Sequence, residues 1–387
     1  MTKLPLLEGP AVDYGEDERA MARYRRDGEA RALALDNRGP LRTDRDGRLD
    51  LGFLDAYWRH GFYVLEGLLG QDELDDLEAD LAELLDRAPI GPGAATDRHG
   101  RPALGAGCRA MTFTWVAPLS DPIGGTDANR GRHPVKMAEP APAPGAPEQV
   151  LQLIVGTLQF SDACLRLYGH PQLLAIAAAI NGDDFAPFNE AIWIKHAHLG
   201  GSVAWHQDGF THWESPDLDA GTHGFNFMAQ LYGCTAANAV WVVPGSHRQG
   251  KADIKALVRA AGSDRLVDAV PLICRPGDVV IANRQLVHGS FANTSPEPRV
   301  TVQHGFHRRR SVLGAVSGPA AQRVVIDEAR VRERSKPIMF GIDARALRYP
   351  HEARFVYQPF AGEEDDYRWT TQTRAGLKDY NLLDLGI

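Results

Sequence analysis

The stretch Trp205-His206-Gln207-Asp208 carries two metal-binding side chains two positions apart. On a β-strand, residues two apart point to the same face, so the imidazole of His206 and the carboxylate of Asp208 can reach one metal ion. A second imidazole, His288, and a cation, Arg299, follow far downstream. Two imidazoles and one carboxylate on one face of an octahedral ion leave the other face open for a chelating keto acid and O₂. The pattern predicts a non-haem Fe(II) site with a cation placed to hold an acidic co-substrate.

Short apolar runs separated by turn residues follow one another from residue 187 to residue 305. The run Val279-Val280-Ile281-Ala282, for example, comes directly after the turn Pro276-Gly277-Asp278. Periodicity typical of helices lies at residues 16–34, 71–87, 148–168, 171–181 and 326–335. Helices followed by a strand-rich half indicate an α+β protein whose mainly β core is an antiparallel sandwich with helices packed outside.

The composition is that of a globular protein, with 387 residues, of which 44% are hydrophobic and 24% charged. A net charge of −8 disfavours a nucleic-acid partner, because phosphates favour a basic surface. No apolar run approaches the roughly 20 residues that cross a bilayer, and the first residues lack the apolar core of a secretion signal. The four cysteines are scattered, so free thiols are expected. We therefore expect a cytoplasmic monomer or homodimer with a small-molecule substrate and no membrane partner.

Residues 88–149 differ from the rest of the chain because glycine and proline are dense there and periodicity is weak. A stretch of this length without regular structure is usually a functional lid or a disordered insertion. We expect a partly ordered lid over the active site, with a solvent-exposed insertion as the alternative. The chain then reads as a single domain, 1–387. Its parts are an N-terminal extension (1–56), a helical support (57–186), the metal-binding core (187–310) and a C-terminal extension (311–387).

Several motifs occur in a fixed order along the core. They are Trp205-His206-Gln207-Asp208, Val243-Pro244-Gly245-Ser246-His247, Pro276-Gly277-Asp278, His288-Gly289-Ser290, Asn293 and Arg299. In this order they resemble the phytanoyl-CoA dioxygenase family, and the resemblance reaches about residues 57–310. It implies a double-stranded β-helix, which is a jelly-roll or cupin-like fold, with Fe(II) as cofactor, 2-oxoglutarate as co-substrate, and O₂. The segment DGFTHW (208–213) is locally similar to ectoine hydroxylase.

The resemblance assigns roles to matching positions. It implies that His206, Asp208 and His288 bind the iron and act in catalysis. It also implies that Arg299 grips the distal carboxylate of 2-oxoglutarate through its planar guanidinium, with Ser290 as a second donor. Halogenating relatives lack the carboxylate ligand, so the presence of Asp208 favours hydroxylation.

Other residues are candidates for the co-substrate or substrate. Lys195 either reaches 2-oxoglutarate or the substrate or ends a solvated strand, and Gln230 is a buried amide that needs partners. Candidate substrate contacts are Trp193, His198, Phe210 and Trp213, and for Trp213 plain packing is an equal alternative. His196 with His198 forms a rival His-x-His pair, but no carboxylate and arginine follow it. His247 is interpreted as structural, and Arg308-Arg309-Arg310 either attracts an anion or is solvated.

Taken together, these features predict a 2-oxoglutarate-dependent dioxygenase. It would hydroxylate an unactivated C–H bond of a small polar metabolite or natural-product intermediate and release succinate and CO₂. Desaturation or ring formation would use the same ligands. The alternatives are a non-oxidative metal-dependent isomerase or lyase on a jelly roll, and a non-catalytic binding protein on the same fold.

Overall fold

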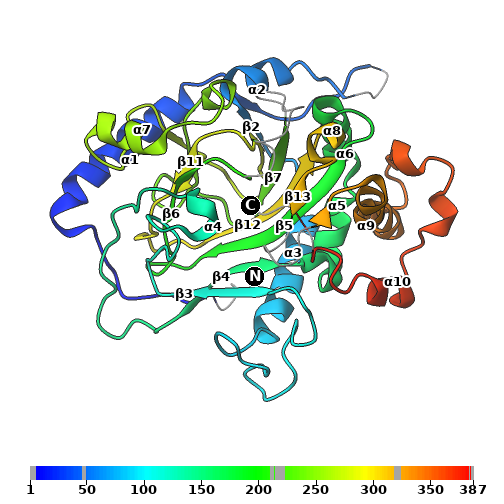
Figure 1. The fold of residues 1–387 in the computed structure, drawn as a ribbon, viewed down its shortest axis with the longest axis horizontal. Helices are drawn as coiled ribbons and strands as arrows, with labels where there is room; N and C mark the ends of the chain where they lie inside the picture. The colour runs from blue at the N-terminus through cyan, green and yellow to red at the C-terminus, as the bar shows by residue number, and fades with distance from the viewer. Residues whose placement is uncertain are drawn as a thin grey trace.

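The computed structural model describes residues 6–45, 49–209, 213, 223–317, 324–382 and 384. Its centre is a pair of antiparallel four-stranded arrays (Figure 1). One array has the order β10-β7-β12-β5 and the other the order β6-β11-β8-β9. The eight strands are β5 (Ala186–Lys195), β6 (Val203–His206), β7 (Gly224–Gln230), β8 (Trp241–Val242), β9 (Val270–Pro271), β10 (Val279–Asn283), β11 (His288–Ser290) and β12 (Arg299–His307).

The chain passes back and forth between the two arrays. From β5 to β8 it alternates strand by strand, β8 and β9 pair within the smaller array, and β10 to β12 alternate again. This connectivity is that of an eight-stranded jelly roll, the double-stranded β-helix. The predicted fold, a mainly β core with flanking helices, is therefore confirmed.

Strands from the first half of the chain extend the larger array at both edges. The strand β2 (Phe62–Leu65) pairs with β10, and the short strand β1 (Arg38–Gly39) pairs in parallel with the other edge of β2. At the other edge, β4 (Val150–Val155) pairs with β5, and β3 (Phe113–Val116) pairs with β4. The strand β4 corrects the helix predicted from residue 148, because pairing with a core strand outweighs local helical periodicity there.

Helices pack outside both sheets. The helices among the described residues are α1 (Glu18–Leu33), α2 (Leu54–His60), α3 (Gln71–Asp86), α4 (Ala128–Gly131), α5 (Asp162–Tyr168), α6 (Pro171–Asn181), α7 (Ile254–Ala261), α8 (Arg309–Val312), α9 (Glu328–Arg348) and α10 (Thr371–Gly376). In Figure 1, α5, α6 and α9 lie on the side of the larger sheet, whereas α1 and α7 lie on the side of the smaller one. A further pair of short strands, β13 (Val316–Ser317) and β14 (Val324–Val325), follows α8.

Side chains along the strands of the larger sheet point alternately toward the apolar core under the helices and toward the pocket. The outward residues Ile192, Phe227 and Val302 belong to one apolar cluster with side chains of α3, α5 and α6. Their neighbours along the strands, such as Trp193 and Gln303, point the other way and line a pocket inside the β-helix. Because the side-chain period of a strand is two, the same strands build the apolar layer under the helices on one face and the wall of the pocket on the other.

The C-terminal extension supports the outer layer. The helix α9 packs against α5 and β5, and the buried guanidinium of Arg334 pairs with Asp384 at 2.7 Å. The helix predicted at 326–335 continues to Arg348. In the part of the chain that the structure describes, no helix combines the length and the apolar character that crossing a membrane requires.

Buried histidines outside the pocket make the stability depend on pH. Burial lowers the pKa of His304 to about 3, and its ring packs edge-on against Tyr168. The unfolded chain binds a proton at this histidine near pH 6.5 and the folded chain does not, so its contribution to stability is lost as pH falls below that value. In His304→Phe, the loss of unfolding free energy between pH 7 and pH 5 should be smaller than in wild type by about 2 kcal/mol. Urea unfolding at both pH values measures this, and equal losses in the two proteins would contradict it.

Candidate metal centre

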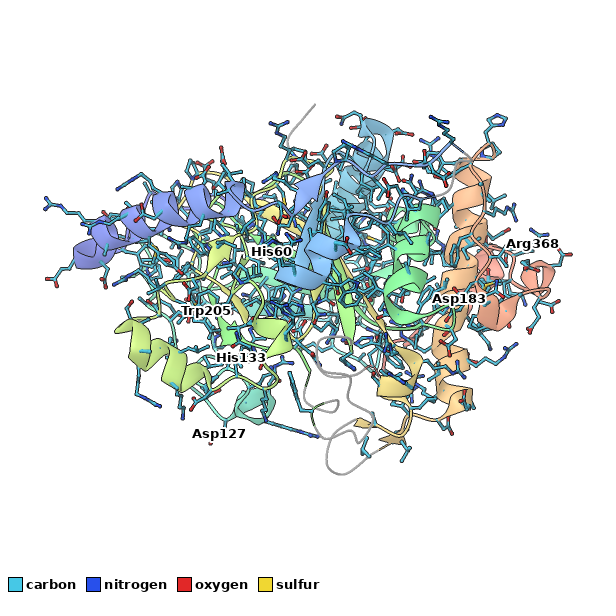
Figure 2. The ribbon with its side chains drawn as sticks, turned by 90° about the horizontal axis from the view of Figure 1, so that it is seen from above. His60, Asp127, His133, Asp183, Trp205 and Arg368 are labelled. Atoms are coloured by element: carbon cyan, nitrogen blue, oxygen red, sulfur yellow. The ribbon has the colours of Figure 1, made fainter. Side chains whose placement is uncertain are left out.

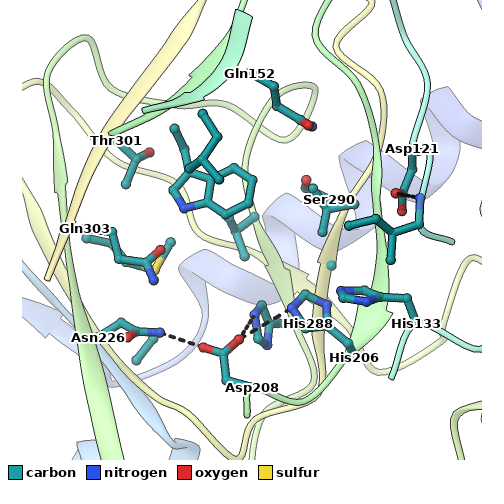
Figure 3. A pocket seen from close by; sticks show the side chains of 18 of the residues that line it. Asp121, His133, Gln152, His206, Asp208, Asn226, His288, Ser290, Thr301 and Gln303 are labelled. Atoms are coloured by element: carbon teal, nitrogen blue, oxygen red, sulfur yellow. Dashed lines mark hydrogen bonds and ion pairs between the residues drawn. The ribbon is translucent and has the colours of Figure 1, made fainter. Parts of the chain in front are cut away.

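Three potential metal ligands meet at one end of the smaller sheet. His206 ends β6, His288 begins β11, and the two residues face each other in the strand register. Asp208 follows β6 by two residues. The Oδ1 atom of Asp208 lies 3.5 Å from Nε2 of His206 and 3.7 Å from Nε2 of His288. Figure 3 marks both contacts with dashed lines. All three ligand atoms lie within 4.8 Å of one another, so the structure brings together the ligand set expected from the sequence.

Backbone carbonyl groups orient both imidazole rings. The Nδ1 atom of His206 lies 2.8 Å from the carbonyl oxygen of Ala204, and that of His288 lies 3.0 Å from the carbonyl oxygen of Leu286. A carbonyl oxygen only accepts, so each Nδ1 carries the proton and each Nε2 lone pair faces Asp208. Burial, followed by the nearby His288, holds the pKa of His206 well below its usual range, which keeps the ring in the neutral form that binds metals.

A polar relay fixes the carboxylate. Asn226 on β7 donates from Nδ2 to Oδ2 of Asp208 at 2.8 Å and accepts from Nη1 of Arg284 at 2.9 Å. The same Nη1 lies 3.9 Å from Oδ2 of Asp208. Burial alone would raise the pKa of Asp208, but the neighbouring Arg284, followed by His288, lowers it, and the pKa lies well below its usual range. The carboxylate is therefore ionised and aimed at the two rings before any metal binds.

The relay leads to a prediction for Asn226. Asn226→Leu keeps the side-chain volume but leaves Asp208 free to turn, so the affinity for Fe(II) or Mn(II) should fall roughly 10- to 100-fold. Titration calorimetry with Mn(II) under anaerobic conditions measures the change. Gln303→Leu is the control, because it removes another amide from the same pocket without touching Asp208, and its affinity should equal that of wild type. Equal affinities in all three proteins would remove Asn226 from this role.

Arg299 lies in the same pocket as the three ligands. It is buried, donates from Nη1 to the carbonyl oxygen of Asn238 at 2.9 Å, and has no hydrogen-bond partner for Nε among the described residues. Within that part of the chain, no carboxylate lies within 4.0 Å of its nitrogen atoms. Burial lowers the pKa of Arg299 to about 10, which still leaves it charged at neutral pH. A buried guanidinium without an anion is costly, and an anionic ligand bound here would offset that cost.

The other co-substrate candidates lie on the inner faces of neighbouring strands. Ser290 is buried and lines the pocket. Lys195 pairs with Arg299 in the register of β5 and β12, and its Nζ donates to the carbonyl oxygen of Phe291. Lys195 is buried, so of the two alternatives the solvated strand end is excluded. Gln230 donates to the carbonyl oxygen of Met228 at 3.2 Å and accepts from Oγ1 of Thr301 at 2.9 Å, so its partners lie within the sheet.

Of the residues expected to contact the substrate, only some lie in the pocket. Trp193 lines the pocket. His198 is turned away: its Nδ1 lies 2.9 Å from the carbonyl oxygen of Thr294, and it is not among the lining residues. Trp213 is half-buried and is also not among them, and Phe210 lies outside the described residues.

The remaining candidates from the sequence serve the scaffold. The ring of His196 accepts from the backbone N–H of Leu7 at 3.2 Å and lies 3.0 Å from the carbonyl oxygen of Leu151, so His196 and His198 form no metal cluster in the described part of the chain. The Nε2 atom of His247 lies 3.1 Å from the carbonyl oxygen of Trp58. Arg309 pairs with Glu328 outside the β-helix.

The segment 88–149 forms one wall of the pocket. Its lining residues are Thr114, Val116, Asp121, Pro122, Ile123, Asn129, Arg132 and His133. It is tied to the ligand-bearing strand, because Oδ2 of Asp121 accepts from the backbone N–H of Ala204 at 2.8 Å and Glu139 accepts from Ser202 at 2.9 Å. These lining residues could not be singled out from the sequence, because the segment has no periodicity that would orient its side chains.

A double-stranded β-helix whose interior holds two histidines and one carboxylate defines the class of facial-triad metal proteins. Within that class, residues 146–301 match the model of the phytanoyl-CoA dioxygenase family. This match confirms the family resemblance that the ordered motifs indicate. Over 115 residues the chain is also 29% identical to phytanoyl-CoA dioxygenase 1 of Oryza sativa subsp. japonica. That alignment covers 27% of this chain and only 38% of the rice protein.

Solved structures with related folds cover about two thirds of the chain. AviO1 from Streptomyces viridochromogenes Tue57 is 22% identical with a TM-score of 0.45, covering 69% of this chain and 96% of its own. EctD from S. alaskensis, solved with 2-oxoglutarate and 5-hydroxyectoine, is 21% identical with a TM-score of 0.47, covering 70% and 79%. The epimerase SnoN from nogalamycin biosynthesis is 18% identical with a TM-score of 0.43, covering 68% and 83%.

Proposed function

We propose that this protein is an Fe(II)- and 2-oxoglutarate-dependent dioxygenase that oxidises a small molecule. The observation that carries the proposal is the buried, unneutralised guanidinium of Arg299 in the pocket that also holds His206, Asp208 and His288. A metal site alone would suit many reactions. A metal site with a separate buried cation suits a ligand that has a chelating group at one end and a carboxylate at the other, as 2-oxoglutarate has.

Each residue then has a defined task. His206, Asp208 and His288 would hold the iron on one face, and Arg299 would bind the distal carboxylate, with Ser290 as a second donor. Iron bound with the keto acid supplies the activation of O₂ that oxidises an unactivated C–H bond and releases succinate and CO₂. The chain itself contributes positioning and the exclusion of water. The pocket walls, including Trp193 and the segment 88–149, enclose a cavity of about 210 Å³ beside the ligands.

The expected reaction is hydroxylation of a small polar metabolite or natural-product intermediate. The intact Asp208 supports this, because the carboxylate occupies the position that a halide would need. Desaturation and cyclisation remain within reach of the same ligand set. All four cysteines are free, which is consistent with the reducing cytoplasm as the proposed location.

Reconstitution without oxygen tests the function. The protein is loaded with Fe(II), titrated with 2-oxoglutarate, and then exposed to O₂ while succinate is measured, first alone and then with a library of polar metabolites. We expect saturable 2-oxoglutarate binding, slow succinate release without substrate, and faster release with a true substrate. Absence of metal-dependent 2-oxoglutarate binding would overturn the proposal. A metal-dependent reaction that proceeds without 2-oxoglutarate would instead support a non-oxidative isomerase or lyase.

A further inference from the structure

A strained turn lies in the pocket wall formed by the segment 88–149. Asn129, Arg130 and Gly131 are consecutive residues in the left-handed region, with φ of +50°, +58° and +68°. This conformation costs a residue with a side chain about 1–2 kcal/mol, and only glycine adopts it freely. Strain of this kind persists where the surrounding structure enforces it, and it clusters at functional sites. Here the turn leads directly into Arg132 and His133, which both line the pocket.

Arg132 enters the pocket without a partner. Its Nε and Nη1 atoms are buried and make no hydrogen bond within the described part of the chain, where no carboxylate lies within 4.0 Å of it either. Burial lowers its pKa to about 10, against the pull of Asp208, so the guanidinium stays charged at neutral pH. Arg132 as a whole is half-buried, and a charge whose buried nitrogen atoms lack partners is costly. It shares the pocket with the proposed metal ligands.

His133 lines the pocket next to Arg132. Its ring centre lies 4.2 Å from that of His206, and its Nδ1 atom is buried without a partner among the described residues. Figure 2 shows Asp127, which precedes the turn, at the surface, and His133 farther inside on the side of Trp205. The turn therefore carries the chain from solvent into the pocket and delivers two side chains with unmet hydrogen-bonding capacity.

The carboxylates that line the pocket already have other partners or roles. The carboxylate of Asp121, which also lines the pocket, accepts from the backbone N–H groups of Ile123 at 2.8 Å and of Ala204 at 2.8 Å. Asp208 belongs to the ligand set. The co-substrate is assigned to Arg299, which lies among Asn238, Cys234 and Cys274 rather than beside Asp208 and Arg284.

We propose that Arg132, assisted by His133, binds a carboxylate or phosphate group of the substrate, so that this enzyme acts on small organic anions. This inference rests on the proposed function, because it takes the pocket beside the ligands as the substrate site. A guanidinium grips either group through two parallel N–H bonds, which would fix the substrate relative to the iron. The strained turn then serves to hold that guanidinium in place before the substrate arrives.

Compact model anions test the proposal without knowledge of the substrate. The probes are benzoate, phenyl phosphate and the neutral benzamide, each titrated calorimetrically into protein loaded with Mn(II) and 2-oxoglutarate. Wild type should bind at least one anion roughly 10- to 100-fold more tightly than benzamide, as expected for hydrogen bonds to a charged group. Whichever anion binds more tightly identifies the group as carboxylate or phosphate. The proposal is overturned if neither anion binds more tightly than benzamide.

Variants locate the binding site. Arg132→Gln should abolish the preference for the anion, and Arg132→Lys should retain part of it. Arg130→Gln is the matched control, because it removes the same charge from an exposed position in the same turn and should leave the preference unchanged. Unchanged anion binding in Arg132→Gln would overturn the assignment.

Titration with 2-oxoglutarate separates this inference from the function on which it rests. Arg132→Gln should bind 2-oxoglutarate as wild type does. A strong loss there would mean that Arg132 serves the co-substrate, and the inference would fall while the dioxygenase proposal stood. If wild type fails to bind 2-oxoglutarate at all, the proposed function fails. Anion binding that still depends on Arg132 in the Mn(II)-loaded protein would then show that the anion site exists on its own.

Discussion

Asp208→Ala should lose high-affinity metal binding and all 2-oxoglutarate-dependent succinate release. The carboxylate is the only anionic member of the ligand set, and its Oδ1 atom lies within 3.7 Å of both imidazole Nε2 atoms. Removing a supporting residue of a metal site typically costs 10- to 100-fold in affinity, so removing a ligand should cost at least about 100-fold. Anaerobic titration with Mn(II) measures the affinity, and the succinate assay measures turnover.

Folding has to be separated from metal binding in this experiment. Loss of Asp208 leaves the buried guanidinium of Arg284 without its nearby anion, which destabilises the protein. Asp208→Asn is therefore the sharper variant, because it keeps the shape of the side chain and removes its charge. Asp278→Asn is the matched control, since Asp278 is equally buried but accepts from the backbone of Gly67 and Arg275, outside the pocket. Wild-type metal affinity in Asp208→Asn, with the control also intact, would refute the ligand assignment.

The ligand set could be anticipated from the sequence because it depends on rules that act over a few residues. His206 and Asp208 share a face through the two-residue period of a strand, and the ordered motifs around them identify the fold. The outer layer could be anticipated for a similar reason, since the spacing of the leucines in α3 predicts one apolar face. Of its members Leu74, Leu77, Leu81, Leu84 and Leu85, the structure buries the first four and half-buries Leu85.

The surroundings of the ligands depend on contacts that the sequence does not order. Asn226 reaches Asp208 from β7, 18 residues later in the chain, and Arg284 joins them from the position directly after β10. Both residues are polar interruptions in apolar runs, and this was the one feature of the sequence that could have indicated them. The feature is not specific, because Gln230 interrupts the same strand as Asn226 and has its partners within the sheet. Arg132 and His133 had no signal, because their direction is set by a left-handed turn within an aperiodic segment.

Replacement of Arg299 should weaken 2-oxoglutarate binding more than any other single change that leaves the metal ligands intact. Removing one partner of a buried, hydrogen-bonded charge pair costs about 2–5 kcal/mol, which corresponds to roughly 30-fold or more in the dissociation constant. Arg299→Gln should therefore raise the dissociation constant for 2-oxoglutarate to this extent while Mn(II) affinity stays near wild type. Arg299→Lys should fall between the two, because it restores the charge but not the planar pair of donors.

The separation between the two affinities is what makes the Arg299 series informative. A merely structural arginine would weaken metal and 2-oxoglutarate binding together through loss of folding, which thermal unfolding of each variant would reveal. Replacing an arginine that binds the co-substrate weakens only 2-oxoglutarate binding. The variant should then stay folded without an added small carboxylate such as acetate. Arg132→Gln provides the internal comparison, since it removes a guanidinium from the same pocket beside Asp208 instead of Asn238. If Arg299→Gln and Arg132→Gln lost 2-oxoglutarate affinity equally, general electrostatic attraction would explain the binding and the assignment of Arg299 to the distal carboxylate would fail.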